Sequence, residues 1–162
     1  MVKSGRIVGL LAASAAALAW APLSAATVSG SLAVSAIVEE TCNLDVRPLH
    51  FDALRSGAPV ADADGSLAVA CTPDTAFVVS MDQGQHHAAG SRRMATAGGQ
   101  YLAYDLYSDP ARTRRWGAIQ AESVTGRIMR AGAVTLPIYA RIAGASAEAG
   151  AYSDMVTVTV SF

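Results

Sequence analysis

The stretch Met155-Val156-Thr157-Val158-Thr159-Val160-Ser161-Phe162, which closes the sequence, decides the fold. Apolar and polar residues alternate along it with a period of two, which predicts a β-strand with one apolar and one polar face. The sequence continues no further, so we expect this strand to lie at the edge of a sheet. There its backbone groups and its apolar face need a partner.

A second alternating segment, residues 27–38, lies at the other end of the chain. One face consists of Val28, Gly30, Leu32, Val34, Ala36 and Val38, and the other is mostly small and polar. The pattern predicts a half-buried strand. Since a free strand in one copy complements an open edge in another, the two ends together predict strand addition between chains.

Four further strands are predicted between these ends, at residues 65–71, 76–81, 101–107 and 134–142. The turn residues Thr72-Pro73-Asp74 predict that the first two form a hairpin. Pro137 predicts an edge position or a bulge for the strand that contains it. Residues 143–151 are rich in alanine but contain two glycines, so we expect a loop. Many short strands without a capped helical pattern indicate an all-β, antiparallel sandwich or barrel.

Residues 1–26 have the layout of a cleaved secretory signal peptide. Lys3 and Arg6 precede the apolar run from Ile7 to Trp20, and Ser24-Ala25-Ala26 provides the small residues of a cleavage site. The alternative is a retained membrane anchor, but the run is shorter than the roughly 18 apolar residues that a membrane-spanning helix needs. We therefore expect residues 27–162 to be exported as one soluble domain with no membrane span.

The composition of residues 27–162 excludes some classes of partner. This part contains 10 Arg and 13 acidic residues, a net charge of −3, and Lys3 is the only lysine of the whole chain. Nucleic-acid binding proteins normally carry a strong basic excess, so no nucleic-acid partner is expected. Charged residues make up only 15% of the chain. This low share favours burial of apolar surface against another chain.

The two cysteines, Cys42 and Cys71, lie in the part expected to be exported. An even pair in an oxidising compartment predicts a disulfide. A metal site is the rival interpretation, but the two residues lack a CxxC spacing.

No catalytic or cofactor-binding residue is predicted. His86 and His87 lie near Asp82, but adjacent residues of an extended segment point to opposite sides and would not converge on a metal. His50 is isolated. The sequence contains neither a GxSxG motif nor a glycine-rich phosphate loop, so we expect no enzyme.

One cluster combines basic and aromatic residues: Arg112, Arg114, Arg115 and Trp116. It could contact an anionic glycan or a neighbouring subunit, with an arginine stacked on the tryptophan. The alternative is a solvated loop whose tryptophan packs into the end of the sandwich. Tyr152 is interpreted as a packing residue.

Several short motifs follow one another in a characteristic order along residues 27–162. They are Cys42-Asn43-Leu44, Leu49-His50-Phe51, Gly65 to Thr72 (GSLAVACT), Phe77 to Gly84, Arg92-Arg93-Met94, Leu102 to Tyr107 (LAYDLY), Trp116-Gly117, Ala149 to Asp154 (AGAYSD) and the closing Val-Thr repeat. With this set the chain resembles the spore coat protein U domain family, the pilin-like subunits of archaic chaperone–usher fibres.

The resemblance implies an incomplete immunoglobulin-like antiparallel β-sandwich (residues 39–162) that is completed by a donor strand from another chain. Residues 27–38 would be the donor, with Val28, Gly30, Leu32 and Val34 inserted. Val156, Val158, Val160 and Phe162 would border the acceptor groove, and Cys42–Cys71 would be the family disulfide.

The implied function is a structural subunit of a surface fibre that polymerises by donor-strand exchange and supports adhesion or biofilm formation. The implied partners are a periplasmic chaperone, an outer-membrane usher and other subunits, with export through the periplasm to the cell surface. The alternative is a self-contained secreted β-sandwich that acts as a coat or glycan-binding protein.

Overall fold

The structure is a computed structural model that describes residues 26–54, 58–145 and 147–162. The predicted signal peptide therefore lies, except for Ala26, outside the described residues. The chain forms two units, Met1–Ala36 and Ile37–Phe162. Residues 26–36 of the first unit form no helix or strand and are exposed. Within the described ranges, no helix is long and apolar enough to cross a bilayer.

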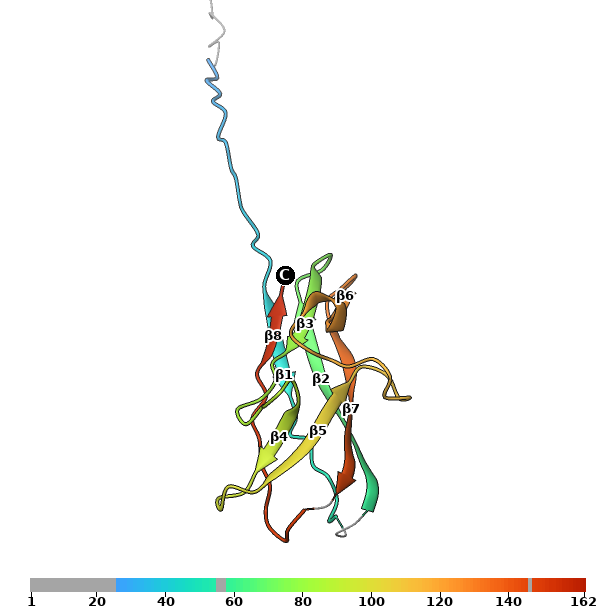
Figure 1. Ribbon diagram of the computed structural model, residues 1–162. Helices are drawn as coiled ribbons and strands as arrows, with labels where there is room; N and C mark the ends of the chain where they lie inside the picture. The colour runs from blue at the N-terminus through green and yellow to red at the C-terminus, as the bar shows by residue number, and fades with distance from the viewer. Residues whose placement is uncertain (1–25, 55–57, 146) are drawn as a thin grey trace, which may run out of the picture. The chain divides into compact units, whose positions relative to one another are not determined.

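The second unit is a sandwich of two antiparallel sheets (Figure 1). The described strands are β1 (Cys42–Val46), β2 (Ala58–Cys71), β3 (Ala76–Met81), β4 (Arg92–Ala95), β5 (Tyr101–Tyr107), β6 (Val124–Arg127), β7 (Ala133–Ala145) and β8 (Val158–Ser161), with a short 3-10 turn, η1 (Gln120–Glu122), before β6. One sheet has the order β1-β2-β7-β5-β4 and the other has the order β6-β3-β8. The immunoglobulin-like antiparallel sandwich predicted from the sequence is confirmed.

The core lies between the two sheets and follows the alternation of the strands. Buried and more exposed side chains alternate along β3 and β5. Phe77, Val79 and Met81 of β3 are buried, as are Leu102 and Leu106 of β5. They form one apolar cluster with buried residues of β2 and β7.

Two large side chains connect the layers of this core. Trp116 is fully buried, and its Nε1–H donates a hydrogen bond of 2.9 Å to the carbonyl oxygen of Val79. Arg92 is also buried and donates to the carbonyl oxygens of Met81, Asp82 and Trp116. Burial lowers the pKa of Arg92, but three carbonyl acceptors satisfy its guanidinium group.

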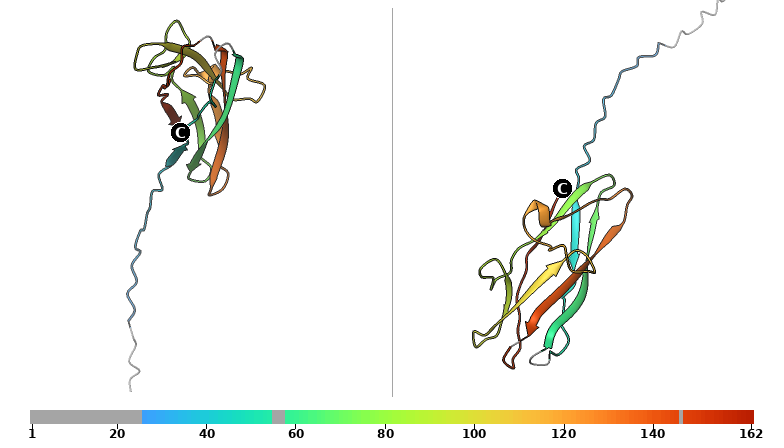
Figure 2. Two further views of the ribbon diagram at one scale, coloured as in Figure 1. Left: turned by 90° about the horizontal axis from the view of Figure 1, so that it is seen from below. Right: turned by 45° about the vertical axis from the view of Figure 1, so that its right-hand side comes forward.

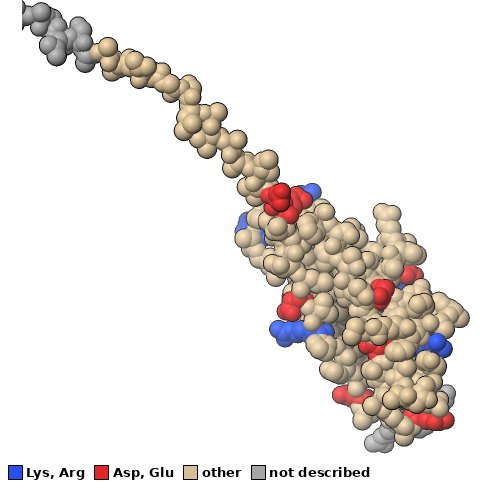
Figure 3. All heavy atoms as spheres, turned by 90° about the vertical axis from the view of Figure 1, so that its left-hand side faces the viewer, with Lys and Arg blue, Asp and Glu red and all other residues tan. Residues whose placement is uncertain are grey.

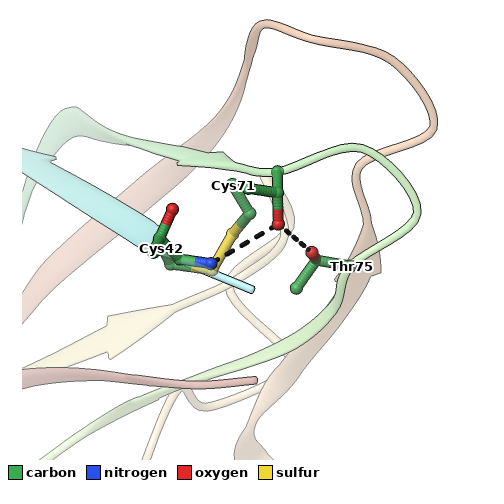
Figure 4. The surroundings of a disulfide bond; sticks show 5 residues. Cys42, Cys71 and Thr75 are labelled. Carbon is green, nitrogen blue, oxygen red and sulfur yellow. Dashed lines mark hydrogen bonds between the residues drawn. A yellow bond between two sulfur atoms is a disulfide. The ribbon is translucent and has the colours of Figure 1, made fainter. Parts of the chain in front are cut away.

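The disulfide between Cys42 and Cys71 is present and joins residues that lie opposite each other in β1 and β2 (Figure 4). The Thr72 hydroxyl accepts a hydrogen bond from the Thr41 amide and shares another with the Thr75 hydroxyl. Because β1 pairs only with β2, these contacts fix the start of an edge strand.

Two local predictions are wrong, and a third holds only at its own residue. The hairpin of residues 65–71 and 76–81 does not form, because β2 and β3 belong to different sheets. Pro137 lies in β7, which as a whole has neighbours on both sides. At Pro137 itself the predicted edge position is present, because the pairing of β5 with β7 stops at Tyr107 and Tyr139, and the missing N–H is therefore tolerated. The predicted loop 143–151 begins only after β7 has continued to Ala145.

Candidate functional site

The last strand, β8, is an edge strand that pairs with β3 and with no other described strand. In the register of this pair, Met81 lies opposite Val158 and Val79 opposite Val160. The Met81 amide donates to Gly117 and the Val79 carbonyl accepts from Trp116, so neither group bonds to β8. These are therefore non-hydrogen-bonded pairs, and the backbone N–H and C=O groups of Val158 and Val160 face the open edge.

The side chains of the closing segment alternate as the sequence predicts. Val156, Val158 and Val160 are partly buried and pack against the core, whereas Thr157, Thr159 and Ser161 are exposed. Phe162 lies beyond the end of β8 and is 58% exposed. The three valines thus combine an inward apolar face with outward, unpaired backbone groups.

The residues before β8 are hydrogen-bonded along one side only. Ser153 exchanges two backbone bonds with Ala95 of β4. The carbonyl oxygens of Met155 and Thr157 accept bonds from the Gln85 and Asp82 amides. The edge that begins at β8 therefore extends back along the preceding residues.

Two carboxylates hold this segment in position. Asp154, whose side chain is 2% exposed, accepts hydrogen bonds from the Tyr104 hydroxyl at 2.7 Å and from the Gln85 amide at 3.0 Å. Burial, together with this carboxylate, raises the pKa of Tyr104 far above its ordinary value, so the hydroxyl remains a donor. Asp82 Oδ1 accepts from the Gly84 and Thr157 amides, each at 2.9 Å. Burial alone would raise the pKa of Asp82, but its hydrogen bonds from Thr157 and Gly84 lower it.

A cavity of about 790 Å³, here called the first cavity, opens between residues 49–54 and residues 147–152. Leu102 and Ile142 contribute core side chains to its lining. Leu49 and Phe51 line it from the segment that follows β1, and both are only partly buried. All views in Figures 1 and 2 show the C-terminus next to β1. The edges of the two sheets, β1 and β8, therefore border one side of the sandwich.

Sequence reasoning assigned the acceptor groove to Val156, Val158, Val160 and Phe162, none of which lines the first cavity, and it did not identify the residues that do. Leu49 and Phe51 alternate with exposed residues as a strand would, but they form no strand. The space beside Leu49 depends on Gly65, where an added Cβ would lie 3.1 Å from Leu49 Cδ1. Only the period-two spacing of Leu49 and Phe51 could have indicated that these side chains share one face.

Residues 27–38 form no strand within the single chain. Val28, Leu32 and Val34 are 99%, 87% and 85% exposed, and nothing lies within 4 Å of a Cβ placed on Gly30. Figure 3 shows the described part of this segment without charged atoms up to its junction with the domain. The predicted apolar face is present in the sequence, and its large side chains are exposed in the described part of the chain.

The histidines do not come together at one site. His86 Nδ1 lies 3.0 Å from Asp154 Oδ1, whereas His87 Nδ1 lies 2.8 Å from the Gly84 carbonyl oxygen. His50 lines the first cavity and is exposed. Over the ranges that the structure describes, no three His, Cys, Asp or Glu residues are grouped as metal ligands.

The basic–aromatic cluster is divided by the fold. Trp116 is in the core, as the structural interpretation predicts, and its ring is not available for stacking by an exposed ligand. Arg112 pairs with Asp64 at 2.6 Å and Arg115 with Asp105 at 2.8 Å, while the Arg114 side chain is exposed. Tyr152 is partly buried and donates to the Glu148 carbonyl, which agrees with a packing role.

Comparison with known proteins adds three similarities. Residues 28–159 match the Spore Coat Protein U domain. The chain is 30% identical to Protein U of Myxococcus xanthus, over 96% of both proteins. It also resembles a chain in the crystal structure of the CsuC-CsuE chaperone-tip adhesion subunit pre-assembly complex, from archaic chaperone-usher Csu pili of Acinetobacter baumannii. That likeness has a TM-score of 0.57 at 23% identity, and it covers 77% of this chain and 40% of the other. At this identity it supports the fold alone.

Proposed function

Because the chain belongs to the spore coat protein U domain family, we propose that it is a structural, non-enzymatic subunit of a surface fibre. Residues 27–38 of one copy insert as a donor strand beside β8 of the next copy. The observation that carries this proposal is the open edge of β8. Its outward backbone groups at Val158 and Val160 need hydrogen-bond partners, and the inward side chains of these two valines are only partly buried against the core.

The donor segment suits this edge chemically. Burial of Val28, Leu32 and Val34 contributes roughly 1.5–3 kcal/mol each, about 5–9 kcal/mol in total before ordering costs. Each new backbone hydrogen bond adds about 1 kcal/mol net. Gly30 has no side chain and suits a place where two backbones approach closely.

The proposal includes two assembly partners that act on the same edge. A periplasmic chaperone covers the edge before assembly, an outer-membrane usher exchanges it for the donor strand, and the fibre reaches the cell surface. There it supports adhesion or biofilm formation.

Signal cleavage after Ala26 places Thr27 at the start of the secreted chain. Since Lys3 is the only lysine, the secreted chain then has one amine, at its N-terminus. Amine labelling with mass spectrometry tests this: a labelled lysine or a different first residue contradicts the cleavage site.

The test of strand exchange compares the two faces of the donor segment. Leu32→Asp places a charge on the apolar face, whereas Ser31→Asp places the same charge on the neighbouring polar position. Each variant is expressed as the full chain in the producing cell. Fibres are followed by electron microscopy and by ladders in unheated SDS samples. Leu32→Asp is expected to abolish the ladder and Ser31→Asp to keep it.

Normal fibres from Leu32→Asp, or from a chain lacking residues 27–34, contradict strand exchange. A self-contained coat or glycan-binding sandwich is the alternative. It predicts a soluble monomer that melts cooperatively, and both aspartate variants would then behave like the unmodified protein.

A further inference from the structure

A second cavity, of about 640 Å³, lies on the β6 side of the three-stranded sheet. The loop of residues 108–115 borders it on one side, and η1 with the start of β6 borders it on the other. Because β6 and β8 are opposite edges of this sheet, a strand that pairs with β8 leaves the second cavity uncovered. The second cavity is therefore independent of the proposed assembly edge.

The loop that forms its wall is held in one conformation. The Asp109 carboxylate accepts hydrogen bonds from the Thr113 amide, the Thr113 hydroxyl and the Arg114 amide. The bond from the Arg114 amide is the main cause that lowers the pKa of Asp109. Arg112 has a φ of 54°, which is uncommon for a residue with a side chain. Its guanidinium group is fixed by Asp64, so the loop is ordered before any ligand arrives.

This ordered loop presents an arginine, Arg114, whose charge acts on Asp109 but whose guanidinium group is not held by a close contact. Arg112 and Arg115 are paired with aspartates, but the Arg114 side chain has no hydrogen bond or ion pair among the described residues. The hydroxyl groups of Ser108 and Thr125, which also line the second cavity, are likewise without partners in that part of the chain. The second cavity thus combines hydroxyl groups with two guanidinium groups, that of Arg115, which is paired with Asp105, and that of Arg114, which forms no hydrogen bond or ion pair in the described part of the chain.

We propose that the second cavity binds an acidic saccharide that carries one carboxylate on each sugar. The Arg114 guanidinium binds the carboxylate with two parallel hydrogen bonds, a geometry that favours arginine over lysine. Ser108 and Thr125 bind hydroxyl groups of the sugar. The volume falls in the range of ligand sites, about 300–1,000 Å³, and exceeds what a small inorganic anion occupies.

Glu122 limits the charge of the ligand. It lines the second cavity, and its carboxylate lies over Gly117, where an added Cβ would overlap it. A ligand with two charges on one group, such as phosphate, meets stronger repulsion from Glu122 than a single carboxylate does. Since Asp105 already pairs with Arg115, the ligand meets one arginine without an ion pair, Arg114, and one nearby carboxylate, Glu122, which favours a uronate over a phosphate.

The test measures binding of tetragalacturonate to the full secreted chain by calorimetry, with maltotetraose and inorganic phosphate as comparison ligands. We expect binding of tetragalacturonate alone, weakened by added salt. Arg114→Ala is expected to reduce the affinity for tetragalacturonate about tenfold. Arg114→Lys is expected to reduce it less, because lysine keeps the positive charge but cannot donate two parallel hydrogen bonds to the carboxylate. Glu122→Gln is expected to increase affinity about two- to fivefold.

Arg130→Ala is the matched control, since Arg130 is exposed on another loop and lies outside the second cavity. It should leave affinity unchanged. An equal loss in Arg130→Ala indicates general charge attraction and overturns the proposal. Absence of tetragalacturonate binding, or equal binding of phosphate, overturns it too. Thermal unfolding of each variant checks that the fold is intact, and these outcomes do not depend on fibre formation.

Discussion

The hydroxyl group of Tyr104 donates a 2.7 Å hydrogen bond to the buried carboxylate of Asp154. Tyr104 belongs to β5 of the five-stranded sheet, and Asp154 lies four residues before β8 of the other sheet. The contact therefore joins the two layers at the point where the open edge begins.

Replacement of Tyr104 by phenylalanine removes this donor and leaves one oxygen of a buried carboxylate short of a partner. We expect a loss of about 1.5–3 kcal/mol in the free energy of unfolding, measured by denaturant titration. Tyr101→Phe is the control, because Tyr101 is half exposed and its hydroxyl has no hydrogen bond among the described residues. Equal stability of the two variants would show that the Asp154 contact adds nothing.

A charge on the inward face of β8 should block assembly. Val158→Asp introduces a carboxylate at a partly buried position of the open edge, whereas Thr159→Asp introduces it at the exposed neighbour. We expect Val158→Asp to abolish the SDS-resistant ladder and Thr159→Asp to retain it. A ladder of full yield from Val158→Asp would exclude β8 as the acceptor strand.

The disulfide should stabilise the edge strand β1. Its cysteines are 29 residues apart, and closure of a ring of this size contributes about 3–4 kcal/mol in the chain-entropy model. The double variant Cys42→Ser with Cys71→Ser should lose about this amount in denaturant unfolding. Reduction of the unmodified protein should reproduce the loss, and a reductant that has no effect on stability would contradict it.

Asp82 should make stability depend on acid pH. Its folded pKa is lowered from 3.8, so its contribution is complete above the unfolded pKa and is lost as pH falls through the folded value. The stability difference between the unmodified protein and Asp82→Asn should therefore be larger near about pH 6 than near about pH 3. Urea titration at both pH values measures it.

Asp45→Asn serves as the control for this pH dependence, because Asp45 is exposed on β1 and has no side-chain hydrogen bond in the described ranges. We expect it to change stability little at either pH. A difference for Asp82→Asn that stays constant with pH would show that its two amide contacts do not depend on the carboxylate charge.

Local periodicity by itself determined the strands with the most regular alternation. Residues 76–81 and 101–107 form β3 and β5 with the predicted bounds, and the valines of the closing strand face inward as predicted. For these strands the signal lies in neighbouring residues, since side chains of a strand alternate between two faces. The disulfide followed from the even number of cysteines together with the predicted export.

Only the tertiary structure decided which strands pair. It placed β2 and β3 in different sheets although the turn residues between them favour a hairpin. It also formed short strands at Cys42–Val46, Arg92–Ala95 and Val124–Arg127, where apolar and polar residues do not alternate clearly. It also left residues 27–38 unpaired although their alternation predicts a strand. Strand pairing depends on partners distant in sequence, and for this segment the periodicity identifies a strand but cannot say which chain supplies its partner.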